Sequence, residues 1–266
     1  MHDLNRDGCL WNLLVIRSGK IRKGNKREFG EDYTIVAEVI DNTTSRGRTL
    51  RFLYDGDHET FRTELYKLGE TPLPKNITRP VEPDDVENFQ TIFAKNIGAV
   101  SAPAAGLHFS RELMKRMEIK GIDVAFLTSH MSLGNFREID VEDLTKHKMD
   151  SEQMEIKPET AETVNNAHDE ARRICAVGVT VMRALESVVG TEGKIKPFSG
   201  WTNKFIFPPY DFTVASSMVT NFHLPYSTLL MLTAAFGDYD HVMHAYDVAI
   251  KEKYQFGVYG DAMLIQ

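Results

Sequence analysis

Residues 221–232 read NFHLPYSTLLML, which joins an ionisable side chain to the start of an apolar helix. His223 lies between apolar neighbours, and the proline two residues later favours a turn. Ser227 or Thr228 can cap the helix that begins there, and the apolar residues that follow predict that it is buried. The free N–H groups and positive end of this helix would face whatever His223 faces. We therefore interpret the segment, Asn221 included, as part of a functional site.

In the larger part of the chain that contains this segment, from residue 84 onward, helices and strands alternate. The pattern predicts a helix at 140–148, an amphipathic helix at 159–173, a buried strand at 174–177 and a helix at 180–189. Such alternation is typical of an α/β domain, with an α+β arrangement as the variant.

The first part of the chain has a different pattern, with β-prone runs in place of alternating helices and strands. Short β-prone runs at 13–16, 33–40 and 49–54 are separated by turn signals, which predicts a small sheet or barrel. A helical pattern at 59–68 and a proline-rich crossing at 69–83 follow. We therefore expect a small β-rich domain at 1–57 and a larger α/β domain of catalytic type at 58–266.

Composition restricts the class of protein. The 266 residues are 42% hydrophobic and 26% charged, as in ordinary globular proteins. No apolar run approaches the roughly 18–20 residues of a membrane span, and residues 1–30 are too polar for a signal or transit peptide. Cys9 and Cys175 lie far apart and predict neither a disulfide framework nor a metal cluster. A reducing cytoplasm is the compartment that these features favour.

The charge is unevenly distributed. A net charge of −7 argues against a protein that coats nucleic acid. Residues 17–27, here called the basic stretch, carry no acidic residue and six basic ones: Arg17, Lys20, Arg22, Lys23, Lys26 and Arg27. The basic stretch is able to contact a phosphate backbone, and the alternative is an ordinary solvated hairpin.

Three other segments place polar groups beside small residues at the ends of predicted elements, where scaffolds commonly carry functional groups. Residues 101–109, SAPAAGLHF, contain Gly106 and His108. Residues 129–137, SHMSLGNFR, contain His130 and Arg137. Residues 177–183, VGVTVMR, form a strand-to-helix turn of the kind that binds anions, and its candidates are Gly178, Thr180 and Arg183.

A fifth candidate segment, YGDAM at 259–263, places Asp261 on a glycine turn. Each segment also has a structural interpretation. A single histidine beside apolar residues is often a hydrogen-bonded core residue, and Asp261 can be a turn cap. The case for a site depends on three histidines, His108, His130 and His223, that all lie next to element ends.

Several familiar sites are disfavoured. No two of these histidines have the i, i+4 spacing of a helical zinc motif, and no cysteine pair assists them. No Gly-x-Ser-x-Gly elbow, dinucleotide glycine fingerprint or phosphate loop occurs. We therefore expect no metal and no nucleophilic serine of the hydrolase type.

The motifs of this chain, and their order along it, resemble those of the S-adenosylmethionine:tRNA ribosyltransferase-isomerase family of the queuosine pathway. The resemblance is clearest from about Leu68 onward, in LGETPLP at 68–74, AGLHF at 105–109, MDSE at 149–152, the segment 221–232 and YGDAMLI at 259–265. It implies a larger α/β barrel-like domain with a smaller β-barrel-like domain.

The resemblance also implies a reaction. The family moves and isomerises the ribosyl part of S-adenosylmethionine onto 7-aminomethyl-7-deazaguanine at the wobble position of tRNA, which gives epoxyqueuosine and releases adenine and methionine. S-adenosylmethionine is consumed as co-substrate, so neither a prosthetic group nor a metal is implied. A cytoplasmic monomer that binds tRNA and no membrane is the corresponding expectation.

The chemistry needs a base for the carbon beside the sulfonium and an acid for the departing adenine, and histidine can serve as either. His108, His130 and His223 are the candidates. Asp261 or Glu152 would orient a histidine or contact the donor's ammonium group, and Arg137 or Arg183 would bind its carboxylate or a tRNA phosphate. The remaining expected substrate contacts are Gly106, Gly178, Thr180, Asn221, Ser227 and Thr228, and the expected tRNA contacts are Lys20, Arg22, Lys23, Lys26 and Arg27.

The chain departs from the family pattern in two motifs. The segment at 129–136 lacks a glycine and a hydroxyl residue of the usual Leu-His-Val-Gly-x-Gly-Thr-Phe, and residues 178–183 replace two hydroxyl residues of Gly-Thr-Thr-Ser-Val-Arg by valine. The family's N-terminal part with its Asn-Asp-Thr-Arg motif is also missing. The alternative function is therefore a non-catalytic or altered-specificity relative that binds tRNA or a nucleoside. An ordinary methyltransferase is disfavoured because no glycine-rich nucleotide loop occurs.

Overall fold

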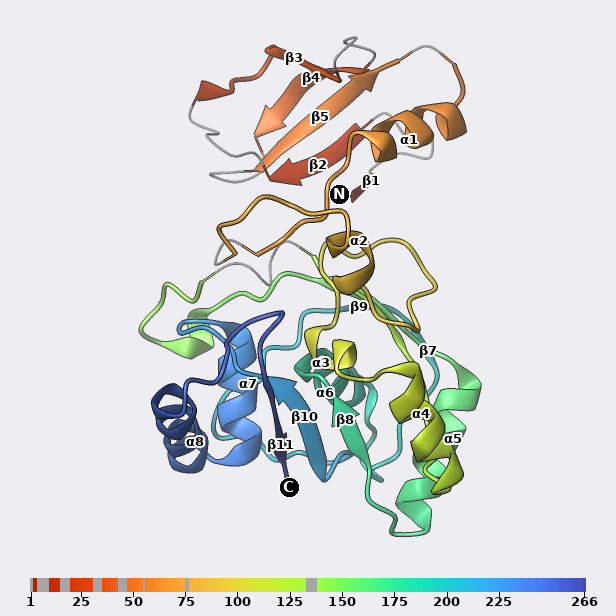
Figure 1. The fold of residues 1–266 in the computed structure, drawn as a ribbon, viewed down its shortest axis with the longest axis vertical. Coiled ribbons are helices and arrows are strands. Elements are labelled where there is room, and N and C mark those ends of the chain that lie inside the picture. The colour runs from red at the N-terminus through yellow and green to blue at the C-terminus, as the bar shows by residue number, and fades with distance from the viewer. Residues whose placement is uncertain are drawn as a thin grey trace. The chain divides into compact units, whose positions relative to one another are not determined.

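A computed structural model describes residues 2–3, 10–14, 20–30, 35–42, 47–54, 56–74, 77–132 and 138–266 (Figure 1). The chain forms two compact units, Met1–Thr71 and Pro72–Gln266. Each mixes helices and strands. The boundary lies after helix α1 (His58–Lys67) rather than at residue 57, because Phe61 of α1 is buried in the core of the first unit.

The first unit is one antiparallel sheet covered by a helix. Its strands are β1 (His2–Asp3), β2 (Leu10–Leu14), β3 (Lys26–Phe29), β4 (Ile35–Asn42) and β5 (Gly47–Leu53), in the order β1-β2-β5-β4-β3. Buried and partly exposed residues alternate along β4, as expected of a strand with one core face. The core holds Trp11, Phe52 and Phe61, whose rings pack edge to face or tilted.

The second unit contains two three-stranded sheets. One has the order β11-β10-β8, with β8 (Cys175–Val177) parallel and β11 (Ala262–Ile265) antiparallel to β10 (Ser217–Asn221). The other is antiparallel, with β7 (Glu152–Ile156) between β6 (Thr128–His130) and β9 (Phe198–Thr202). Within the described residues no sheet closes on itself, so the expected barrels are not found: each sheet has two edge strands.

Helices surround these sheets. They are α2 (Asp85–Asn88), α3 (Ala104–Leu107), α4 (Arg111–Ile119), α5 (Pro158–Asp169), α6 (Val179–Val188), α7 (Thr228–Gly237) and α8 (Tyr239–Lys251). Figure 1 shows α7 and α8 beside the β11-β10-β8 sheet, and the two helices contact each other. The core contains Met182 of α6, Met218 of β10 and Leu232 of α7, so the segment 221–232 is anchored in the core of this unit.

Most of the predicted elements of the second unit are confirmed. Ser227 is the N-cap of α7, and its Oγ accepts a hydrogen bond from the Leu230 N–H at 3.1 Å. The helix predicted at 140–148 is wrong: only a 3₁₀ turn, η3 (Leu144–Lys146), forms there. The Asp143 carboxylate accepts hydrogen bonds from both the N–H and the hydroxyl of Thr145, and such local bonds compete with a helix.

Candidate functional site

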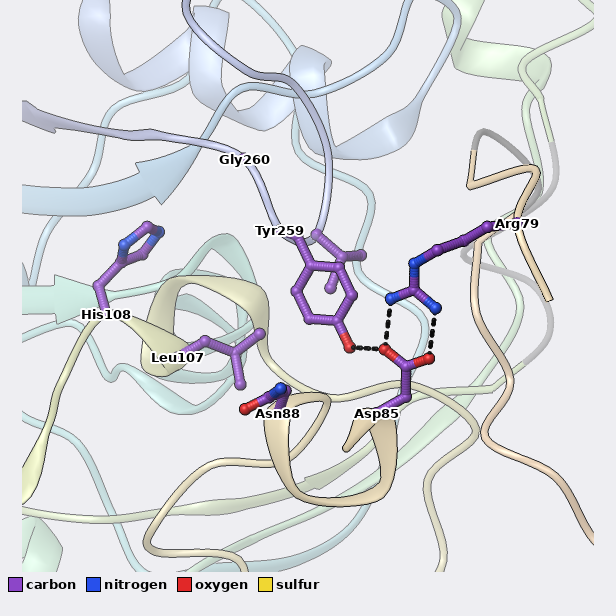
Figure 2. A pocket seen from close by; sticks show the side chains of 8 residues that line it. Arg79, Asp85, Asn88, Leu107, His108, Tyr259 and Gly260 are labelled. Atoms are coloured by element: carbon purple, nitrogen blue, oxygen red, sulfur yellow. Dashed lines mark hydrogen bonds and ion pairs between the residues drawn. The ribbon is translucent and has the colours of Figure 1, made fainter. Parts of the chain in front are cut away.

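A pocket of about 420 Å³ lies in the second unit (Figure 2). It is lined by Arg79, Asp85, Asn88, Leu107, His108, Val258, Tyr259 and Gly260. Figure 2 shows His108 and Leu107 on one side and Arg79, Asp85 and Tyr259 on the other. The volume is within the range of small-molecule sites. The pocket therefore joins one of the three candidate histidines to a charged cluster.

Helix α3 positions His108, which is the C-cap residue of this single helical turn. Gly106 is buried, and a Cβ atom there would lie 3.0 Å from Thr91 Cγ2 and 3.2 Å from Phe93 Cε2. A larger residue would push α3 away from these side chains. The run of small residues thus lets α3 pack closely enough to place His108 beside β10, which α3 contacts.

Asn221 determines which nitrogen of His108 carries the proton. The Asn221 Nδ2 amide donates to the carbonyls of Gly257, Val258 and Gly260 at 2.9, 3.4 and 3.2 Å. Carbonyls only accept, so the other amide atom, 3.1 Å from His108 Nε2, is the acceptor oxygen. Neutral His108 therefore carries its proton on Nε2, and the lone pair of Nδ1 is available to accept a proton.

Asp85 organises the other side of the pocket. Its carboxylate accepts two hydrogen bonds from Arg79 at 2.7 Å each, one from the Tyr259 hydroxyl at 3.0 Å and one from the Glu82 N–H at 2.8 Å. The bonds from Arg79 hold the pKa of Asp85 far below its usual range and raise that of Arg79. Burial raises the pKa of Tyr259, with its bond to Asp85 as the second cause. All three groups therefore keep fixed protonation states near neutral pH.

His223 lies outside this pocket and is half-buried. Its ring Nε2 is 2.8 Å from Thr220 Oγ1, and its backbone N–H donates to the Tyr246 hydroxyl at 2.8 Å. Burial lowers the pKa of His223 to about 4. The ring is neutral at pH 7 but a weak proton acceptor, because a general base works best with a pKa near the operating pH. Of the two, His108 is the better placed base.

Protonation of His223 should make stability depend on pH. Between pH 6.5, its usual pKa, and about pH 4 the unfolded chain binds a proton that the folded chain does not, so stability falls as pH falls. We expect this residue to contribute about 2 kcal/mol to the loss between pH 7.5 and 5.0. Urea unfolding of the wild type and His223→Gln at both pH values measures it. The exposed His241→Gln is the control, and an equal loss in wild type and His223→Gln would contradict the assignment.

A second cluster surrounds Glu152, which is almost completely buried. Its carboxylate forms an ion pair with buried Arg183 of α6 and accepts a hydrogen bond from the Ser132 N–H at 3.1 Å. Burial lowers the pKa of Arg183 to about 10, so the guanidinium stays charged at neutral pH. Thr180 approaches Met131 with Oγ1 3.8 Å from the sulfur. These contacts join α6 to the segment that follows His130.

His130 ends β6, and its ring packs against Gly98: a Cβ there would lie 2.5 Å from its Nδ1. That Nδ1 is buried and has no hydrogen-bond partner among the described residues. Like His223, His130 does not line the pocket of Figure 2. The structure thus brings His108 and Asn221 together, and Glu152 with Arg183, whereas Arg137 lies outside the described residues.

The other candidates have local roles. Gly178 is the N-cap of α6 at φ 98°, a backbone conformation that favours glycine, and its N–H donates to Val219 O at 2.7 Å. Thr228 is buried at the first position of α7, with an Oγ1 that bonds to no described residue. Asp261 is exposed, and its carboxylate accepts a hydrogen bond from the Gln255 N–H at 2.7 Å. That bond closes the loop carrying Tyr259 and Gly260, the turn-cap arrangement considered for Asp261.

Four polar residues of the pocket were not predicted from the sequence: Arg79, Asp85, Asn88 and Tyr259. Tyr259 lies in the YGDAM motif, where the candidate predicted from the sequence was Asp261. Asp85 and Tyr259 are 174 residues apart, so no spacing rule connects them. Among the described residues no group of three histidine, cysteine or acidic side chains is arranged to hold a metal. None of the described helices is both long and apolar enough to cross a membrane.

Comparison with known proteins identifies the family. The family described as "Queuosine biosynthesis protein" matches residues 2–265. Two relatives named S-adenosylmethionine:tRNA ribosyltransferase-isomerase, from Phocaeicola vulgatus and Parabacteroides distasonis, are 70% and 67% identical over 265 residues, which is 100% of this chain and 76% of each relative. A crystal structure of S-adenosylmethionine tRNA ribosyltransferase from Thermotoga maritima is 28% identical, with a TM-score of 0.51 over 100% of this chain and 73% of that chain. The chain belongs to the S-adenosylmethionine:tRNA ribosyltransferase-isomerase family of queuosine biosynthesis proteins.

Proposed function

We propose that this chain transfers and isomerises the ribosyl part of S-adenosylmethionine onto 7-aminomethyl-7-deazaguanine in tRNA, with epoxyqueuosine, adenine and methionine as products. Relatives up to 70% identical carry the name of this enzyme, and they align with the whole chain. S-adenosylmethionine is a co-substrate, and the family implies no prosthetic group. We place the enzyme in the cytoplasm, as a monomer, where tRNA is its macromolecular partner.

One observation carries the mechanism: the His108–Asn221 pair at the wall of the pocket. Because Asn221 Oδ1 accepts a hydrogen bond from the Nε2–H group, Nδ1 of neutral His108 is free to remove a proton from the carbon beside the sulfonium. The positive sulfur makes that proton acidic. The imidazolium that results can give a proton to adenine as its glycosidic bond breaks. His108 is then neutral again, so one residue serves as base and acid.

Adenine release from S-adenosylmethionine tests this function. The assay contains an anticodon stem-loop with the modified base at the wobble position, and omits it in the control. Stem-loop-dependent release of adenine with matching incorporation of the ribosyl group supports the enzyme. Calorimetric binding of both substrates without any adenine release would instead favour the non-catalytic relative.

We further propose that the basic stretch binds the tRNA backbone. Lys20, Arg22, Lys23, Lys26 and Arg27 are all exposed, and none pairs with an acidic group among the described residues. The turn is held by bonds between the Gly24 N–H and Val39 O and between the Val39 N–H and Asn25 O, at 2.8 and 2.9 Å. β3 follows as an edge strand, so these cations stand on an ordered hairpin.

The salt dependence of tRNA binding distinguishes this interface from a solvated hairpin. Each lost phosphate contact should lower the slope of log affinity against log salt by about 0.7–0.9. We expect Lys23→Ala and Lys26→Ala to weaken stem-loop binding with such a reduced slope, measured by fluorescence anisotropy. Lys251→Ala, at the exposed end of α8, is the control. An unchanged slope in both hairpin variants would mean that the basic stretch is an ordinary solvated hairpin that does not contact tRNA.

A further inference from the structure

The Arg79 guanidinium in the pocket is held rigidly by bonds that use only part of its donors. Nη1 donates to Asp85 Oδ2 at 2.7 Å and to Pro80 O at 2.9 Å, and Nη2 donates to Asp85 Oδ1 at 2.7 Å. An arginine has five N–H groups, so the Nε–H and one Nη2–H make no bond to a described residue. These two groups lie on one edge of the planar guanidinium and form the fork that binds a carboxylate in a bidentate manner.

Asp85 cannot take a ligand itself. Its two oxygens already accept four hydrogen bonds, from Arg79 twice, from Tyr259 and from the Glu82 N–H, which fills their lone pairs. Its function is therefore to fix the guanidinium and the Tyr259 ring. The Tyr259 ring is in turn packed edge to face on Phe89, with centroids 5.9 Å apart. The free fork of Arg79 is thus pre-organised.

The pocket has the charge balance that an amino acid needs. Arg79 is flanked by two carboxylates, Asp85 and the more exposed Glu82, whose Oε2 lies 3.9 Å from Arg79 Nη1. A ligand that carries an ammonium group as well as a carboxylate therefore fits these surroundings better than a simple anion does. The same pocket contains His108, whose Nδ1 is the proposed base. A donor molecule with an amino-acid end and a reactive carbon beside sulfur would place these two parts at the two sides that Figure 2 shows.

We propose that Arg79, fixed by Asp85 and Tyr259, binds the carboxylate of the methionine part of S-adenosylmethionine. This inference rests on the proposed function and names the group that anchors the donor. It replaces the expectation that Arg183 does so, since Arg183 is buried and paired with Glu152. A tRNA phosphate is the competing anion, but the small concave pocket favours the carboxylate of a small molecule.

Decarboxylated S-adenosylmethionine tests the subsite, because it keeps the sulfonium, ribose and adenine but lacks the carboxylate. We expect wild type to prefer S-adenosylmethionine by about ten- to a hundredfold in kcat/KM for adenine release. Arg79→Met should lose that preference, with kcat/KM falling for S-adenosylmethionine and nearly unchanged for the decarboxylated donor. A folding defect would lower both values alike, so the ratio separates binding from stability.

Arg172→Met is the matched control, since Arg172 pairs with two carboxylates, Asp123 and Glu170, and does not line the pocket. It should keep the wild-type preference. If Arg79→Met alone folds poorly, Arg79→Met with Asp85→Asn removes both charges and should show the same lost preference. An unchanged preference in these variants, or a raised KM for the stem-loop instead, would overturn the proposal.

The proposed function can fail separately. If wild type releases no adenine, the dissociation constants of the two donors are compared by calorimetry. The same loss of preference in Arg79→Met then supports the subsite, and equal constants in wild type overturn it.

Discussion

His108→Ala should lower stem-loop-dependent adenine release by about a hundred- to ten-thousandfold, the usual contribution of a general acid–base residue. The variant removes the only histidine among the three candidates that lines the described pocket. Binding of S-adenosylmethionine should change much less, because the proposed carboxylate contact at Arg79 remains. Single-turnover kinetics with saturating donor separates the chemical step from binding.

The control for His108→Ala is His241→Ala, which removes an imidazole that is 87% exposed on α8. It should retain wild-type turnover. His130→Ala and His223→Ala complete the series, since neither ring lines the pocket. If His108→Ala turned over normally while either of these lost activity, the base would lie at the second cluster or beside Thr220 instead.

Local sequence signals predicted the local structure well. The N-cap Ser227, the buried α7 and the strand–turn–helix at Gly178 each depend on neighbouring residues, and each is present. Local competition also explains the failure at 140–148, where Asp143 bonds to Thr145 in a way that an amphipathic pattern does not reveal. For the first unit the strand pattern left a sheet and a barrel both open, and the resemblance implied barrels for both domains; sheet closure depends on pairings that periodicity does not encode.

The site was only partly predictable for the same reason. His108 and Asn221 were both singled out, but the bond between them spans 113 residues, and only the fold reveals it. Arg79 lies in the proline-rich crossing at 69–83 and Asp85 just after it, and neither carries a local signal of a site. Their place in a pocket becomes apparent only through the hydrogen bond between Asp85 and Tyr259, near the other end of the chain. Residue types could therefore be nominated from sequence, whereas their partners could not.

Asn221→Leu should damage both activity and stability, because one buried amide serves four partners. The variant leaves His108 Nε2 without its acceptor and three loop carbonyls without their donor. We expect the free energy of unfolding to fall by at least about 1–3 kcal/mol, the cost of a buried unsatisfied group. With its tautomer no longer fixed, His108 should also lose rate, by about tenfold or more in kcat.

Asn165→Leu separates the two effects. Asn165 also ties a loop, through bonds of 2.9 Å to the N–H and the carbonyl of Ile195, but unlike Asn221 it bonds to no residue that lines the pocket. Both variants should lose stability in urea unfolding. Well below both melting temperatures, only Asn221→Leu should lose kcat, with KM for S-adenosylmethionine little changed. Equal activity in the two variants would mean that Asn221 only supports the loop, and that the proton on His108 Nε2 is held there without it.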